Sequence, residues 1–173
     1  YYAEAIFYLK KALKKTKDKN KEARINYTLG QLNLLLSEPK FKEAQGYFEQ
    51  VIKKNPEYKM VFNAKLMRSK AYDPSLINES GNSFEKIKRS LYQMLKDDKN
   101  IEYRDQIYFA LGNLELKNQD TISSTKYLKM STETSISNDA QKMESHWVLA
   151  NIFWIQKDYI GAYHHSDSAY QLS

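Results

Sequence analysis

The chain has 173 residues and no cysteine, which excludes disulfide bonds and thiol chemistry. With 42% hydrophobic residues but only 5 glycines and 3 prolines, it favours an all-α fold over a sheet protein. A net charge of +6 is concentrated in residues 1–60, which hold 13 basic and 7 acidic residues. No run of apolar residues is long enough to predict a membrane-spanning helix.

The elements predicted in chain order are one unpaired amphipathic helix followed by four helix pairs. Residues 1–17 resemble the second helix of a pair whose first helix is missing, so we expect a piece of a longer array, with any targeting signal upstream. The pairs cover residues 22–56, 57–98, 100–136 and 138–173, and the second pair contains the inserted loop "DPSLINESGNS". The expectation is therefore about nine helices in a single array over 1–173.

Small residues recur at one period in both helices of the pairs. In the first helices they lie 39, 43 and 38 residues apart, at Gly30, Ser69, Gly112 and Ala150. In the second helices they are Ala5, Ala44, Ser124 and Ala162, and most are followed four residues later by a large side chain. Such a double row indicates a helical repeat array in which these positions are helix crossings.

Gly112 shows why a crossing is the favoured interpretation. Glycine inside a helix costs about 1 kcal/mol relative to alanine, so a close neighbour must require the missing side chain. On this basis Gly112→Leu should overpack the crossing, and Gly112→Ala is expected to be tolerated.

Helix ends are predicted from capping residues. Asp120 and Asp158 precede return helices and can accept free backbone amides. Asn138, with Gln141 three residues later, has the spacing of a capping box. Pro56 and Pro74 fall at segment ends, where proline is least costly.

The repeats resemble the tetratricopeptide motif, whose signature is W-x2-L-G-x2-Y, then A-x3-F, then P. "NYTLGQLN" and "KEAQGYFEQVIKKNP" carry it through Leu29, Gly30, Ala44, Phe48 and Pro56, and "YFALGNLELKNQDTISSTKYLKMS" and "HWVLANIFWIQKDYIGAY" follow it. The second pair departs from it, with Arg68 in place of the leucine. The resemblance implies antiparallel helix pairs stacked into a right-handed superhelix with a concave inner surface.

A narrower resemblance covers about two thirds of the chain. The stretch from "YDPSLINESGNS" through "MLKDDKNIEYRDQIYFALGNLELKNQDT", with a later "QK", "DY" and "DS", is similar to the repeat region of SprE/PorW-type proteins. These are lipoproteins of Bacteroidota that serve type IX protein secretion and gliding motility. The resemblance implies the periplasmic side of the outer membrane, a lipid-anchored parent chain without a membrane span, and other secretion components as partners.

The tetratricopeptide resemblance also implies that the first helix of each pair lines the concave face. Helical spacing from the small residues then places aromatic and amide side chains on that face. They could anchor a partner and pair with a peptide backbone, although some aromatics could equally pack as core. The predicted groove residues are Arg24, Tyr27, Gln31, Asn63, Lys70, Gln106, Phe109, Asn113, Trp147, Asn151 and Trp154.

The sequence contains few residues arranged for catalysis or metal binding. His164, His165 and Asp167 cluster in sequence, but adjacent helical residues point about 100° apart and chelate one ion poorly. His146 falls on a packing face, and no phosphate-binding or nucleophile motif is present. We predict no enzyme activity, no metal and no cofactor.

The run "KKALKKTKDKNK" could meet an anionic lipid, an acidic partner or nucleic acid, or could simply be a solvated surface. Nucleic acid is disfavoured because the aromatics lie elsewhere. The favoured function is a protein-interaction scaffold of the secretion apparatus. The alternative is a generic tetratricopeptide sensory or adaptor module of a cytoplasmic signalling protein.

Overall fold

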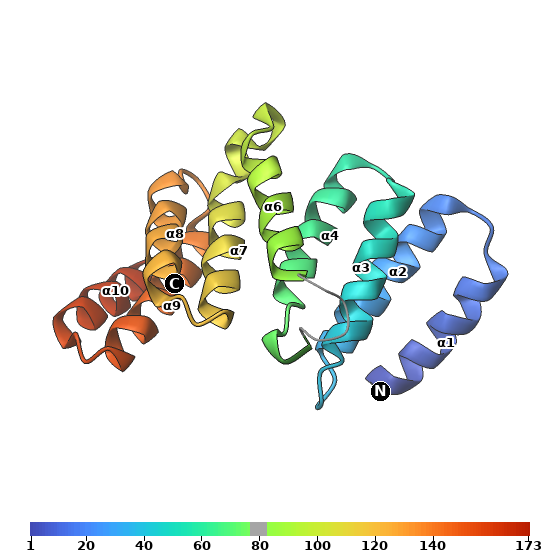
Figure 1. Cartoon of the computed structure of the whole chain (residues 1–173), viewed down its shortest axis with the longest axis horizontal. Helices are drawn as coiled ribbons and strands as arrows, with labels where there is room; N and C mark the ends of the chain where they lie inside the picture. The colour runs from blue at the N-terminus through green and yellow to red at the C-terminus, as the bar shows by residue number, and fades with distance from the viewer. Residues whose placement is uncertain (77–82) are drawn as a thin grey trace. The chain divides into compact units, whose positions relative to one another are not determined.

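The computed structural model describes residues 1–76 and 83–173 (Figure 1). Within these ranges there are nine α-helices and two short 3-10 helices, and no strand, which confirms the predicted all-α class. The α-helices are α1 (Tyr2–Lys15), α2 (Lys19–Leu34), α3 (Phe41–Lys54), α4 (Tyr58–Lys70), α6 (Ser83–Leu95), α7 (Arg104–Lys117), α8 (Thr121–Thr134), α9 (Asp139–Ile155) and α10 (Tyr159–Gln171). The 3-10 helices are η1 (Pro74–Leu76) and η2 (Asp98–Tyr103).

The chain forms two compact units, Tyr1–Ile87 and Lys88–Ser173, and the boundary between them falls within α6. The continuous array over 1–173 therefore stays a prediction. In the first unit α1 packs against α2, α2 against α3, and α3 against α4. One buried cluster of this unit consists of Ala23, Ala44, Phe48, Val51, Ala64 and Ala71, and Leu29, Phe62 and Tyr72 are buried as well.

In the second unit α7 packs against α8, α8 against α9, and α9 against α10. Direct contact between α7 and α9 makes these two helices neighbours as well. Leu128 of α8 is buried together with Leu149 and Ile152 of α9, and Phe109 of α7 packs against this cluster. Each helix thus buries an apolar stripe that it could not bury alone.

Two glycines lie where helices cross closely. A Cβ atom placed on Gly30 would lie 2.6 Å from the ring of Phe48, and one placed on Gly112 would lie 2.7 Å from Leu128 Cγ and 3.3 Å from the Ser124 carbonyl oxygen. Even a methyl group at Gly112 would therefore force its neighbours to move. The expectation that Gly112→Ala is tolerated is wrong, because it weighed helix propensity without this contact.

The other predicted crossing residues follow the same trend with one exception. Ala44, Ser69, Ser124, Ala150 and Ala162 are all buried. Ala5, by contrast, is only half-buried, while the adjacent Ile6 is the buried residue of α1.

Capping side chains fix the starts of α2, α8, α9 and α10. Asp120 accepts from the Ser123 amide, Asp158 from the Gly161 amide and Asn138 from the Gln141 amide, as predicted. Asp18, which was not among the predicted caps, accepts from the amides of residues 20 and 21, so α2 begins at Lys19 instead of 22. The η2 turn occupies 98–103, so α7 begins at Arg104 instead of 100.

Arg68 occupies the position of the motif leucine, and its positive charge is paired with Glu49. Its side chain is buried, and Nη1 lies 3.6 Å from Glu49 Oε1 on α3. Burial lowers the pKa of the guanidinium, and the Glu49 carboxylate acts in the opposite direction. Glu49 also lies 3.3 Å from Lys86 Nζ. The helix α4 therefore packs against α3 with a charged residue in an apolar position.

Candidate protein-binding surfaces

An exposed stripe on α9 carries three of the predicted groove residues. Trp147, Asn151 and Trp154 are spaced by four and three positions, so they share one helix face. Trp147 is 61% exposed and Trp154 is 64% exposed, which is unusual for the largest apolar side chain. The Asn151 amide donates to the Trp147 carbonyl at 2.8 Å, which fixes its orientation and leaves its carbonyl oxygen as an acceptor.

The corresponding stripe on α7 is more buried. Asn113 donates to the Phe109 carbonyl at 2.9 Å, as Asn151 does to Trp147 in α9. Phe109 is half-buried against the core cluster of α8 and α9, and Gln106 is also half-buried. Because α7 and α9 are in direct contact, the two stripes belong to neighbouring helices. Here Phe109 serves mainly as core, and the tryptophans of α9 supply the exposed surface.

The predicted groove residues of the first unit do not form a comparable aromatic surface. Tyr27 packs edge-on against Phe48 with ring centroids 5.7 Å apart, and burial raises the pKa of its hydroxyl. Gln31 and Asn63 are half-buried, whereas Arg24 and Lys70 are exposed. In this unit the predicted aromatic anchor, Tyr27, packs as part of the core.

Further exposed apolar side chains continue from α9 onto α10. The Trp154 ring meets Tyr159 edge-on, with centroids 5.3 Å apart. These residues were not among the predicted groove residues, although Tyr159, Tyr163 and Tyr170 are spaced by four and seven positions and share one exposed face of α10. The exposed residues are Ile155, Tyr159, Ile160, Tyr163 and Tyr170.

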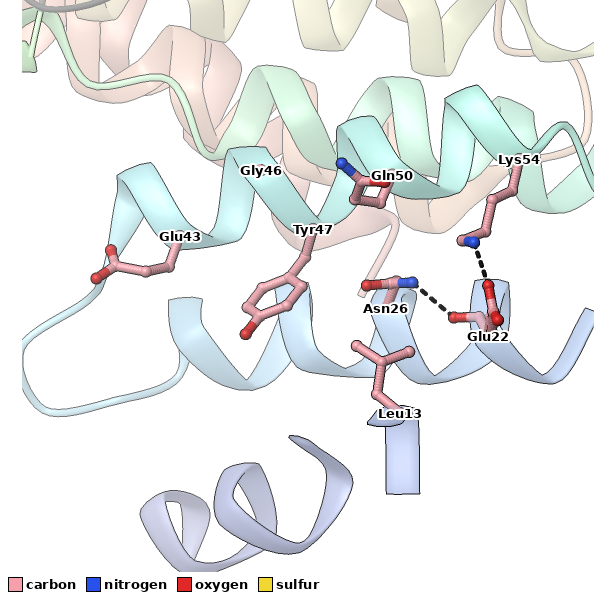
Figure 2. A pocket seen from close by; sticks show the side chains of 8 residues that line it. All are labelled: Leu13, Glu22, Asn26, Glu43, Gly46, Tyr47, Gln50 and Lys54. Carbon is pink, nitrogen blue, oxygen red and sulfur yellow. Dashed lines mark hydrogen bonds and ion pairs between the residues drawn. The ribbon is translucent and has the colours of Figure 1, made fainter. Parts of the chain in front are cut away.

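A separate cavity of about 510 Å³, open to solvent, lies on the surface of the first unit among α1, α2 and α3 (Figure 2). An ion pair between Glu22 and Lys54 closes one end, and the buried Asn26 donates to the Glu22 carbonyl at 2.8 Å. None of the predicted groove residues lines it. The lining residues are Leu13, Glu22, Asn26, Glu43, Gly46, Tyr47, Gln50 and Lys54.

Two histidines from different helices are joined in the second unit. His146 Nδ1 on α9 lies 2.9 Å from His165 Nδ1 on α10, and the His165 ring stacks on Phe153. Burial is the main cause that lowers the pKa of both rings, and Lys142, Lys129 and His164 add to it. His164 and Asp167, grouped with His165 by sequence, take no part in this contact.

The remaining candidate features are a metal site, a membrane-spanning helix and a match to a known family. Within 1–76 and 83–173, no three histidine or carboxylate side chains gather in a way that could hold a metal ion. None of the described helices combines the length and apolar content needed to cross a bilayer. No protein-family model matches the chain, and no curated protein matches its sequence significantly.

Proposed function

We propose that this chain is a non-enzymatic protein-interaction scaffold that binds a polypeptide segment of a partner through α7 and α9. The observation that carries the proposal is the pair of exposed tryptophans, Trp147 and Trp154, on either side of Asn151. Tryptophan offers a large contact area at low entropic cost and is among the commonest anchors of protein interfaces.

The asparagines complement the tryptophans. Because the Asn113 and Asn151 amide nitrogens already donate to their own helices, each side chain presents an oriented carbonyl oxygen. Such oxygens accept hydrogen bonds from peptide N–H groups. An oriented acceptor between two aromatic anchors suits a peptide main chain better than a small apolar molecule.

The resemblance to SprE/PorW-type lipoproteins supports a particular setting for this scaffold. We propose that it is a structural or assembly component of the type IX secretion and gliding apparatus, on the periplasmic side of the outer membrane. Its partners would then be other components of that machinery. The alternative, a cytoplasmic adaptor of a signalling protein, is separated from it by the parent chain: a lipidation cysteine supports the first, and an attached kinase or DNA-binding domain the second.

Intrinsic fluorescence tests the site directly, because Trp147 and Trp154 are the two tryptophans of the chain. Titrating a purified partner should shift the tryptophan emission to shorter wavelength as the exposed indoles are covered. Trp147→Ala should weaken binding at least about tenfold, since truncating an anchor typically costs about 2 kcal/mol.

Ile136→Ala is the matched control. Ile136 is 96% exposed but lies in the connection between α8 and α9, away from the stripe. Its truncation should leave affinity unchanged, and Lys14→Ala and Lys15→Ala should matter little except at low salt. Binding that depends on the lysines and ignores Trp147 would place the site elsewhere.

A further inference from the structure

The cavity of the first unit contains a glycine that the fold does not require. Gly46 lies inside α3, where glycine costs about 1 kcal/mol relative to alanine. A Cβ atom placed there would meet nothing within 4 Å, in contrast to Gly30 and Gly112. Close neighbours therefore account for Gly30, Gly112 and Gly161, whereas packing gives no reason for a glycine at position 46. Glycine is also the residue that lets a ligand approach a backbone closely.

The walls beside Gly46 combine apolar and hydrogen-bonding groups. Figure 2 shows Tyr47 extending from α3 and Leu13 from α1 into the space over α2. Asn26 and Gln50 supply amide groups along the same space. A volume of about 510 Å³ lies within the range of sites that hold a small ligand or a short stretch of peptide.

One end of the cavity is strongly basic. The ion pair between Glu22 and Lys54 joins the start of α2 to the end of α3, and Leu13 of the last turn of α1 lines the same cavity. Glu22 is engaged in that pair, and Asp18 is engaged in capping α2. Lys54 is neutralised by Glu22, and the excess positive charge comes from six exposed lysines of the same three segments: Lys14, Lys15, Lys17, Lys19, Lys21 and Lys53. Such a concentration of positive charge attracts a negatively charged segment.

We propose that this cavity is a second binding site, which takes an extended polypeptide segment with an apolar side chain followed by acidic residues. The apolar side chain seats between Leu13 and Tyr47, and the main chain passes over Gly46. The acidic residues lie among the lysines at the end marked by Lys54. This site is distinct from the tryptophan face, so the failure of either leaves the other standing.

A labelled synthetic peptide with a leucine pair followed by a run of glutamates is the probe, and fluorescence anisotropy measures its binding to the full chain. Peptides with serines for the leucines, or with lysines for the glutamates, should bind at least about tenfold more weakly. Added salt should weaken binding of the glutamate peptide, because exposed charges are screened.

Gly46→Leu fills the cavity from α3 without meeting other atoms at its Cβ, so it should fold normally and bind the peptide at least about tenfold more weakly. Thr28→Leu is the matched control, since Thr28 is exposed on α2 and does not line the cavity. Equal binding by Gly46→Leu and the parent, or no binding of the glutamate peptide, would overturn the proposal. The proposal would also be overturned if a single-stranded oligonucleotide displaced the peptide and bound Gly46→Leu as tightly as it binds the parent.

Discussion

Gly112 on α7 lies directly against Leu128 on α8: a Cβ atom on the glycine would come within 2.7 Å of Leu128 Cγ. Gly30 on α2 has the same relationship to Phe48 on α3. In both cases the large residue follows, four positions later, the small residue of the return helix, Ser124 or Ala44. The two units thus repeat one crossing, in which a missing side chain on one helix receives a large side chain from the next.

Gly112→Ala should destabilise the protein by about 1–3 kcal/mol, because the new methyl group overlaps Leu128 and crowds the Ser124 carbonyl. Urea unfolding measures the loss. Gly46→Ala, also inside a helix but with open space around its Cβ, should instead stabilise by up to about 1 kcal/mol. Equal effects of the two substitutions would show that helix propensity, and not the close crossing, determines the change in stability.

Arg68→Met should leave the free energy of unfolding unchanged or raise it, since replacing a buried charge by an apolar side chain of similar length removes a desolvation cost. Glu49→Gln should lower it by about 1–2 kcal/mol, because the buried guanidinium loses its carboxylate partner. Both are measured by chemical denaturation. Glu43→Gln, also on α3 but with no ion pair in the described structure, should change stability by less than about 0.5 kcal/mol.

Asp105→Ala should cost about 1–3 kcal/mol through loss of a buried polar network at the start of α7. The Asp105 carboxylate accepts from the Gln106 amide at 2.8 Å and from Asn138 Nδ2 at 2.9 Å, so it links α7 to the cap of α9. Thermal unfolding compares this variant with Asp139→Ala, which removes an exposed carboxylate from the first turn of α9. A similar small effect for both would contradict the structural role of Asp105.

Stability of the second unit should fall as the pH drops below about 6.5. Burial lowers the pKa of His146 and His165 from the ordinary value of 6.5, so the unfolded chain takes up protons more readily than the folded one. The stabilisation is therefore present above pH 6.5 and is lost as pH falls through the folded-state pKa values. Double protonation also removes the Nδ1–Nδ1 hydrogen bond, which needs one neutral acceptor.

The check is the urea midpoint measured from about pH 7.5 down to about pH 5.5, above the range in which most carboxylates titrate. His165→Gln should flatten this dependence. His164→Asn should largely preserve it, because His164 is exposed and is the smallest of the causes that lower the pKa of His165. A parent protein whose midpoint is constant over this range would contradict the prediction.

The sequence by itself determined the helical class, the starts of α8, α9 and α10, and most of the small residues that lie buried at helix crossings. These properties depend on local chemistry: an aspartate before a helix caps it wherever the helix later packs, and a period of small residues marks one face of each helix. The position of Gly112 at a close crossing could therefore be predicted from spacing, whereas its partner Leu128 came from the structure. The penalty for Gly112→Ala could not, because it depends on a distance of a few tenths of an ångström between two helices.

Only the tertiary structure decided which side of each amphipathic helix is covered. Phe109 and Trp147 occupy equivalent repeat positions, yet Phe109 packs on the core and Trp147 stays exposed. The His146–His165 contact and the cavity beside Gly46 likewise join side chains from separate helices. Helical periodicity fixes the direction of a side chain relative to its own helix axis, but exposure depends on which neighbouring helix lies against that face, and this follows from packing across the whole unit.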